Sequence, residues 1–160
     1  MILKLDMEFD PSRILQDYYD LGLEQTQICI TSKDLQGGLG ATHPCEEPLF
    51  YEVNPLLKDT YTEEVIKEVR KKYCVYRIRF MKMPALQCYR LHTDWTPRLH
   101  VPLKTQEGAF YILDNKLYEM DEEGQLYYFN ARVKHTAVNA STEDRIHLLF
   151  TLDSAYEISI

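Results

Sequence analysis

Two side chains able to bind a metal stand two positions apart in the segment His92-Thr93-Asp94. On an extended backbone, successive side chains point to opposite sides, so the first and third residues of this segment share a face. One metal ion could therefore accept the imidazole and the carboxylate together. Such a short pattern also occurs at ordinary polar strand ends, and the pair needs support from other residues.

A third ligand could come from His135, in the segment Val133-Lys134-His135-Thr136. Two histidines and one carboxylate on one face of a metal leave the remaining coordination positions open to small molecules. This facial arrangement is typical of non-haem iron(II) oxygenases. The sequence therefore predicts a metal site formed by His92, Asp94 and His135.

Arg145 follows His135 by ten residues and begins an apolar run that includes Ile146, Leu148 and Phe150. Arginine is rarely placed in a buried strand without an anionic partner. A bound carboxylate would supply that partner, because the planar guanidinium matches a carboxylate with two parallel hydrogen bonds. A structural salt bridge to an internal Asp or Glu is the alternative.

Arg98 and His100 stand two apart in Arg98-Leu99-His100-Val101-Pro102-Leu103, with apolar residues between them. Both side chains should lie on one face of a strand, which suggests a basic pocket for an anion. His100 alone would more often be a hydrogen-bonded core histidine, and the same holds for His147, which shares a face with Arg145.

From Tyr89 to Asp153 the chain resembles the aspartyl/asparaginyl β-hydroxylase family of iron(II)- and 2-oxoglutarate-dependent oxygenases, a family that also includes bacterial proline hydroxylases. The resemblance rests on five elements in order: His92-x-Asp94, Arg98-x-His100-x-Pro102-Leu103, a Gly124 turn leading to Phe129-Asn130, His135-x-x-x-Asn139, and Arg145-x-His147-Leu148.

The resemblance implies that His92, Asp94 and His135 bind Fe(II) and that Arg145 holds the distal carboxylate of 2-oxoglutarate. Arg98 and His100 would assist at the carboxylates of the cosubstrate or the substrate. The implied reaction uses O2 to hydroxylate a C–H bond of an amino acid, a peptide side chain or a small metabolite. It releases succinate and CO2, and ascorbate should support it. Tyr89 and Tyr76 are candidates for a second contact at the distal carboxylate.

Two departures limit the resemblance. Animal members of the family can lack the carboxylate ligand, whereas Asp94 is present here, which places this chain nearer the three-ligand members. The sequence also ends at Ile160, soon after the last expected strand, and leaves no room for the additional C-terminal domain of the proline hydroxylases. The aspartyl substrate therefore cannot be transferred, and free proline becomes a weaker expectation.

The elements that must hold these residues are two helices followed by about eight short strands. Asp10-Pro11 begins a helically spaced apolar stripe that ends near Gly22, and a second helix begins at Thr62 with acidic residues in its first turn. Short β-rich runs separated by turn residues then follow, and they are 75–83, 86–92, 99–103, 109–113, 117–120, 126–129, 136–139 and 146–152.

This order indicates an α+β chain, mainly β, built on a β-sandwich or barrel. The resemblance implies a double-stranded β-helix, a cupin-like jelly roll, with the two N-terminal helices outside one sheet. We expect one domain over 1–160, comprising a helical and loop part (1–73), a jelly-roll core (74–153) and a tail (154–160). The loop from Ser32 to Asp59, with Phe50 and Tyr51, is our hypothesis for a substrate lid.

Composition excludes several other functions. The chain carries 18 basic and 25 acidic residues, a net charge of −7, and no concentrated basic surface, so nucleic acid is not an expected partner. No apolar run is long enough for a membrane span or a signal peptide. Four cysteines without a CxxC pair suggest reduced thiols in the cytoplasm.

Two other functions remain open at this stage. A non-catalytic cupin-like module could hold a metal, or merely line a polar cavity, with the same three residues. A dioxygenase that needs no oxo acid would keep the metal, but it would leave Arg145 without an obvious anion. The expected ligands are therefore a small-molecule or peptide substrate, iron and 2-oxoglutarate, and the identity of the substrate is open.

Overall fold

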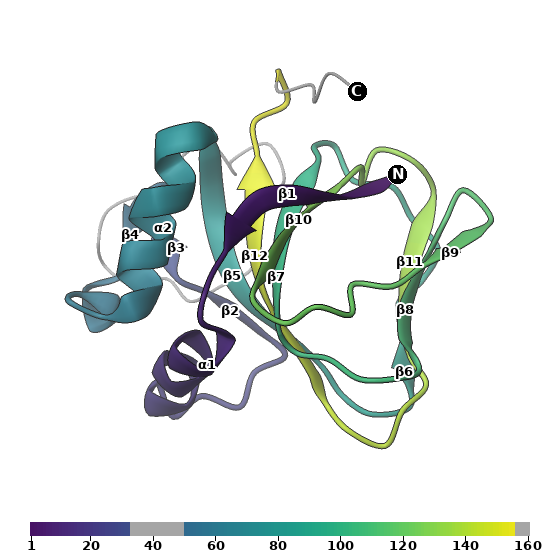
Figure 1. The fold of residues 1–160 in the computed structure, drawn as a ribbon, viewed down its shortest axis with the longest axis horizontal. Helices are drawn as coiled ribbons and strands as arrows, with labels where there is room; N and C mark the ends of the chain where they lie inside the picture. The colour runs from purple at the N-terminus through teal and green to yellow at the C-terminus, as the bar shows by residue number, and fades with distance from the viewer. Residues whose placement is uncertain (33–49, 156–160) are drawn as a thin grey trace.

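The computed structural model describes residues 1–32 and 50–155, which form two facing antiparallel sheets with two helices on one side (Figure 1). The larger sheet contains, in spatial order, β1 (Ile2–Glu8), β10 (Gln125–Phe129), β7 (Arg98–Lys104), β12 (Arg145–Leu152), β5 (Val75–Met83) and β2 (Gln27–Cys29). The smaller sheet contains β6 (Gln87–Cys88), β11 (His135–Asn139), β8 (Ala109–Leu113) and β9 (Lys116–Tyr118).

From β5 to β12 the chain passes back and forth between the two sheets, which is the winding of a double-stranded β-helix. A separate short pair, β3 (Thr31–Ser32) with β4 (Glu52–Val53), and a 3₁₀ turn, η2 (Pro55–Leu57), lie beside the helices. The predicted fold class is confirmed.

The helices α1 (Pro11–Asp20) and α2 (Tyr61–Lys72) cover the outer face of the larger sheet (Figure 1). The carboxylate of Asp10 accepts the Ser12 and Arg13 amides at 3.0 and 3.3 Å, and the Thr60 hydroxyl accepts the Glu63 amide at 3.3 Å, so both N-termini are capped. Each helix buries an apolar stripe against the sheet, so the predicted helices are confirmed. The buried positions include Ile14, Tyr18, Val65, Ile66 and Val69.

Strand β12 lies between β5 and β7. Its side chains point alternately to the helix-covered face of the larger sheet and to the face that lines the interior of the jelly roll. Leu148 pairs with Phe80 on one side and with Val101 on the other, and all three pack into the core under the helices. Because side chains alternate along a strand, Arg145 and His147 point the opposite way, into the space between the sheets. Both are buried, so polar groups line the interior of the jelly roll.

Two predicted strand assignments were wrong. No strand is predicted before the first helix, yet β1 pairs with β10 at the edge of the larger sheet. Partly buried and exposed residues alternate along β1, as expected for an edge strand covered on one face. The predicted strand over 86–92 is reduced to β6 and an isolated bridge between His92 and His135.

Gly124 allows β1 and β7 to meet the turn before β10. Its carbonyl accepts the Phe9 amide at 3.0 Å, its amide donates to the Pro102 carbonyl at 2.8 Å, and its φ is 85°. A Cβ atom at this position would lie 2.2 Å from the Phe9 carbonyl oxygen. Any side chain would therefore force the backbone apart.

We expect Gly124→Ala to lower the free energy of unfolding by about 3 kcal/mol or more, since it combines a left-handed backbone with a backbone clash. Gly22→Ala is the matched control, because Gly22 also has a positive φ but nothing lies within 4 Å of the added Cβ. Urea denaturation should show a loss of only about 1–2 kcal/mol for this control. Equal losses in both variants would contradict the clash.

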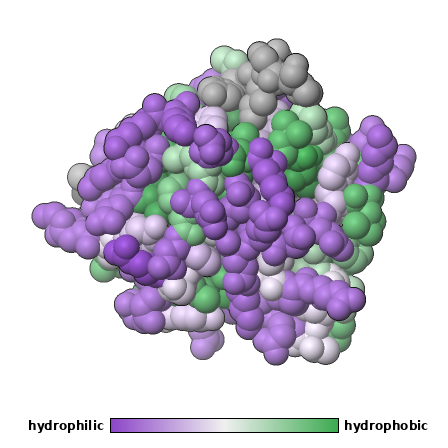
Figure 2. Space-filling view, viewed as in Figure 1, coloured by the Kyte–Doolittle hydropathy of each residue, from purple (hydrophilic) through white to green (hydrophobic). Residues whose placement is uncertain are grey.

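Hydrophilic residues cover most of the face seen in Figure 2, and hydrophobic patches appear on the side of the four-stranded sheet. Within the described residues, no helix has the length and apolar character needed to cross a membrane.

Candidate functional site

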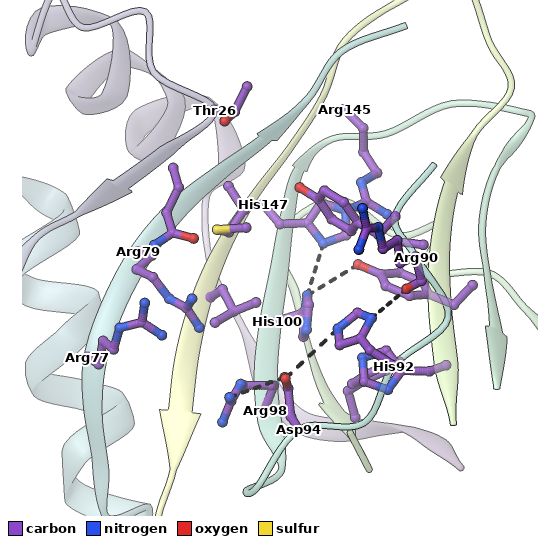
Figure 3. A pocket seen from close by; sticks show the side chains of 18 of the residues that line it. Thr26, Arg77, Arg79, Arg90, His92, Asp94, Arg98, His100, Arg145 and His147 are labelled. Carbon is purple, nitrogen blue, oxygen red and sulfur yellow. Dashed lines mark hydrogen bonds and ion pairs between the residues drawn. The ribbon is translucent and has the colours of Figure 1, made fainter. Parts of the chain in front are cut away.

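A cavity of about 540 Å³ opens between the two sheets (Figure 3). This volume is within the range that holds a small ligand. Basic and aromatic side chains dominate the wall, and Asp94 is the one carboxylate among the described lining residues. The polar and aromatic members are Thr26, Gln27, Arg77, Arg79, Tyr89, Arg90, His92, Asp94, Trp95, Arg98, His100, Tyr111, Phe129, His135, Arg145 and His147.

The structure brings His92, Asp94 and His135 together at this cavity. The backbones of His92 and His135 exchange two hydrogen bonds, of 3.0 and 2.8 Å, and the Asp94 amide donates to the Ala131 carbonyl at 2.8 Å. One ligand atom from each of the three side chains lies within 4.8 Å of the others. The predicted trio therefore forms a group able to hold one metal ion.

His92 and His135 both offer Nε2 to the candidate metal position. Nδ1 of His92 lies 2.6 Å from the Arg90 carbonyl oxygen, and Nδ1 of His135 lies 2.9 Å from the Val133 carbonyl oxygen. A carbonyl only accepts, so each Nδ1 carries the proton and each Nε2 keeps its lone pair for a metal. Backbone carbonyls commonly orient metal-binding histidines in this way.

Burial favours the form of His135 that binds metal. Its side chain is buried, and this desolvation lowers the pKa of the imidazole below its usual value, with a hydrogen bond to Val133 acting in the opposite direction. The ring is therefore neutral near neutral pH, as metal coordination requires. The residues present fit a divalent metal of the kind that accepts imidazole and carboxylate ligands.

Arg98 lies against the carboxylate ligand. Its Nη2 is 3.1 Å from Oδ2 of Asp94, and its Nη1 donates to the Thr96 carbonyl at 3.1 Å and to the Thr96 hydroxyl. Oδ1 of Asp94 faces the other way, 3.9 Å from Nε2 of His92. This geometry supports a role in orienting Asp94, and the contact with a cosubstrate stays a prediction.

We expect Arg98→Ala to weaken metal binding about 10- to 100-fold, because the Asp94 carboxylate loses the group that orients it. Titration of the metal-free protein with Co(II), followed by absorption spectroscopy, would measure this. Arg13→Ala, which removes an arginine that stacks on Tyr61 in the helical layer, is the matched control and should leave affinity unchanged. An unchanged Co(II) affinity in Arg98→Ala would instead favour the predicted carboxylate-binding role.

Arg145 enters the cavity from β12, opposite β8 (Figure 3). Its side chain is 4% exposed, and its Cζ lies 4.9 Å from the centre of the Tyr111 ring. Its Nε and Nη1 atoms have no hydrogen-bond partner within the described chain, and no ion pair to Arg145 occurs there. A buried cation with unused donors facing a cavity could bind an anion.

His100, on β7, lies deeper in the cavity beside two other buried side chains. Its Nδ1 is 3.3 Å from Nδ1 of His147 and 3.4 Å from the hydroxyl of Tyr111. Burial, followed by the nearby charge of Arg145, lowers the pKa of both imidazoles well below the usual value. Both rings are therefore neutral.

Comparison with known protein families agrees with this geometry. A family model described as aspartyl/asparaginyl beta-hydroxylase matches residues 57–154, more than half of the chain. The chain belongs to the aspartyl/asparaginyl β-hydroxylase family. A search among curated protein sequences gave no match.

Solved structures share the fold of this family member at low sequence identity. The viral collagen prolyl hydroxylase of Paramecium bursaria Chlorella virus-1, solved with 2-oxoglutarate, is 13% identical over 95% of this chain and 96% of its own, with a TM-score of 0.54. IDO of Bacillus thuringiensis is 13% identical over 97% and 94%, with a TM-score of 0.53. AviO1 of Streptomyces viridochromogenes Tue57 is 11% identical over 99% and 92%, with a TM-score of 0.50.

Phe50 and Tyr51, the two residues named for the predicted lid, are not among the described residues that line the cavity of this hydroxylase-family chain. The Phe50 carbonyl accepts the Arg77 amide at 2.7 Å, and the Tyr51 ring stacks on Arg70 of α2, 3.7 Å from its Cζ. Residues 33–49, most of the predicted loop, lie outside the described residues, so the lid stays a prediction. Tyr89 lines the cavity and Tyr76 does not.

Sequence reasoning missed Tyr111, Arg77 and Arg79. Arg77 and Arg79 reach the cavity from β5 (Figure 3), and both are buried. Between the pairs formed by Leu149 and Thr151 of β12, β5 carries one extra residue, and Arg77 in this bulge has a φ of 38°. Two arginines two apart in an apolar strand are the same signal that singled out Arg98 and His100, whereas nothing in the sequence distinguishes Tyr111 from an ordinary core tyrosine.

Proposed function

We propose that the protein is an iron(II)- and 2-oxoglutarate-dependent dioxygenase. It hydroxylates a C–H bond of an amino acid, a peptide side chain or a small metabolite, and it releases succinate and CO2. The observation that carries this proposal is that the cavity holding His92, Asp94 and His135 also contains the buried guanidinium of Arg145, which has no ion pair among the described residues. A metal site and an anion site on one cavity are what a carboxylate cosubstrate bound to a metal requires.

Each of the chain's own residues has a defined task in this proposal. The Nε2 atoms of His92 and His135 and Oδ1 of Asp94 would hold Fe(II), while Arg98 keeps the carboxylate turned toward it. Bound iron would supply the activation of O2 on which this class of enzyme depends. Arg145 would take the distal carboxylate of 2-oxoglutarate, and the walls between the sheets exclude water and orient the substrate.

The exposure of the ligands suggests how the substrate reaches the site. The His92 side chain is 42% exposed and the Asp94 side chain 30%, whereas His135 is buried. We take the exposed side formed by His92 and Asp94 as the mouth of the cavity, whereas Arg145 and His147 are buried. A cosubstrate that occupies the Arg145 end would leave the mouth free for the substrate.

The direct test is turnover of 2-oxoglutarate by the purified protein with iron(II), ascorbate and O2, in the presence of a panel of amino acids and peptides. We expect one class of compound to stimulate succinate release, with one hydroxylated product formed for each succinate. If the protein bound the metal but never formed succinate, the non-catalytic cupin-like module would be the better description.

A further inference from the structure

Two arginines of β5, Arg77 and Arg79, line the cavity that contains the candidate metal site. Both side chains are buried, and Figure 3 shows them on a different part of the cavity wall from Arg145. Neither is a candidate metal ligand, and neither is needed for the anion site at Arg145. A buried arginine on a cavity wall offers a charge and several hydrogen-bond donors to whatever occupies the cavity.

The strand register fixes where Arg79 lies. Leu149 of β12 pairs with Arg79 on one side and with His100 on the other, so the three residues form one row on the inner face of the sheet. Neighbouring strands are about 4.8 Å apart, which places the Arg79 backbone about 10 Å from that of His100. Burial and the charges of nearby arginines, Arg79 among them, lower the pKa of the His100 imidazole. The charge of Arg79 therefore acts inside the cavity.

Arg145 pairs with a different part of β5. Its partner is Met83, the last residue of that strand, and Arg79 lies four residues earlier. A strand rises about 3.4 Å per residue, so the two arginine backbones are about 14 Å apart along the strand direction. Their side chains are separate in Figure 3 as well. The cavity therefore has two distinct positions at which an arginine can hold an anion.

Arg77 lies at the metal end of the larger sheet. Thr151 of β12 pairs with Arg98 on one side and with Tyr76, the neighbour of Arg77, on the other. Arg98 in turn contacts the carboxylate of Asp94 at 3.1 Å. The row of the sheet that reaches the candidate metal site therefore also contains the start of β5.

A β-bulge gives Arg77 its position on the cavity wall. Its φ of 38° is a conformation that residues with a side chain rarely adopt. The Phe50 carbonyl accepts the Arg77 amide at 2.7 Å, and the Arg77 carbonyl accepts the Thr151 hydroxyl at 3.3 Å, so hydrogen bonds hold this conformation. Bulges and uncommon backbone conformations often direct a side chain toward a ligand. The bulge thus allows Arg77 to line the same cavity as Arg79.

We infer that Arg77 and Arg79 form a second anion-binding site, which holds the acidic group of the substrate while the C–H bond to be hydroxylated lies at the metal. The substrate is then a small acid that carries a carboxylate or a phosphate. The identification of this acid as the substrate rests on the proposed function, whereas the second anion site does not.

The charges around the cavity support an acidic substrate. The described lining residues include five arginines and one carboxylate. A divalent metal and the dianion of 2-oxoglutarate cancel each other's charge, so their binding leaves the positive excess unchanged. An acidic group on the substrate would reduce this excess, and the guanidinium fork matches the oxygens of carboxylates and phosphates. Each guanidinium has five N–H donors, so it can contact the chain and a ligand together.

The burial of the two arginines favours a small acid over an acidic polypeptide. Arg77 is 6% exposed and Arg79 is 7% exposed, so an acidic group must enter the cavity to reach them. A cavity of about 540 Å³ has room for a small molecule beside the cosubstrate. A polypeptide would have to bring its backbone past the exposed side of the candidate metal site.

The second anion site can be tested without metal or turnover, in an Arg145→Met background that lacks the first site. We expect inorganic phosphate to raise the unfolding temperature of this metal-free protein. Adding Arg77→Met or Arg79→Met should weaken phosphate binding about 10- to 100-fold, because hydrogen bonds to a charged group are lost. Arg79→Lys keeps the charge and should recover part of the affinity. No effect of phosphate on Arg145→Met, or an effect that both further substitutions leave unchanged, would overturn the inference.

Arg70→Met, in the same background, is the matched control. Arg70 is a half-buried arginine that stacks on Tyr51, and it does not line the cavity. Its substitution should leave phosphate binding unchanged. A loss equal to that of Arg79→Met would show that the effect does not come from the cavity and would contradict the inference.

Turnover tests whether the bound acid is the substrate. A panel of small carboxylates and phosphate monoesters, each paired with its uncharged amide or parent alcohol, separates the two kinds of acid. We expect one acid to stimulate succinate release at least about tenfold more than its uncharged counterpart. In Arg79→Met, the concentration of this acid needed for half-maximal stimulation should rise at least about tenfold, and the requirement for 2-oxoglutarate should stay within about threefold.

Two results of the turnover experiment would overturn the assignment of the substrate. One is stimulation by uncharged compounds alone or by acidic peptides alone. The other is an equal rise in the requirement for 2-oxoglutarate in Arg79→Met, which would assign this arginine to the cosubstrate. Phosphate binding at Arg77 and Arg79 without any formation of succinate would refute the proposed function and leave the second anion site standing.

Discussion

Alanine at His92, Asp94 or His135 is expected to abolish the formation of succinate from 2-oxoglutarate, with a residual rate at least about 100-fold below that of the unmodified protein. Each substitution removes one of the three side chains that could hold the metal, so only two potential ligands remain. Loss of a metal that supplies the reaction chemistry lowers the rate far more than loss of a binding contact. Succinate release with saturating iron(II) measures the effect.

Metal content separates a missing ligand from a misfolded protein. The three variants should bind Co(II) weakly and keep the circular dichroism of the unmodified protein, because the ligands project from segments held by backbone hydrogen bonds. Asp20→Ala, at the exposed end of α1, is the matched control for Asp94 and should retain full activity. Full activity in any two of the three ligand variants would refute the metal site.

Arg145→Met is expected to raise the concentration of 2-oxoglutarate needed for half-maximal turnover by at least about 100-fold. Truncating one partner of a buried, hydrogen-bonded charge pair typically costs 2–5 kcal/mol or more, and methionine fills a similar volume without charge. Arg145→Lys should recover part of the affinity, because a lysine supplies the charge but not the paired hydrogen bonds. Steady-state kinetics with varied 2-oxoglutarate measures both, and an unchanged requirement in Arg145→Met would refute this role.

The same substitution should make the ligand-free protein more stable. A guanidinium that is 4% exposed and has no ion pair in the described part of the chain destabilises the folded state, so Arg145→Met should raise the free energy of unfolding by about 1–3 kcal/mol. The unmodified protein should gain stability when 2-oxoglutarate and Mn(II) are added, whereas the variant should gain much less. A ligand-free variant less stable than the unmodified protein would show that Arg145 has a structural role instead.

The types of the potential ligands and their spacing in the sequence predicted much of the candidate site. Residues two apart on an extended segment must share a face, which is why His92 with Asp94, and Arg145 with His147, could be read directly from the chain. The order of motifs led to the family, and the family match confirms it. The pairing of His92 with His135 does not follow from local spacing, because it depends on two backbone hydrogen bonds between residues that are 43 positions apart in the sequence.

Local sequence rules were least effective at the sheet edges. Strand β1 exists because β10 offers it an edge, and the exposed segment 86–92 forms only β6 and an isolated bridge at His92, both paired with β11. Neither outcome is decided by the propensity of the segment itself. The strands with neighbours on both sides, such as β5 and β12, were predicted within one residue at each end.

The sequence by itself determined the residue types at the candidate metal site, the buried arginine of the cavity, the two helices and the mainly β architecture, because each of these depends on periodicity or on chemistry within a short segment. Only the tertiary structure decided that Arg98 faces Asp94 and that Tyr111 and His147 meet at His100. These contacts join strands that are neighbours only after the two sheets have closed on each other, and no local pattern records which side chains will meet in the space between them.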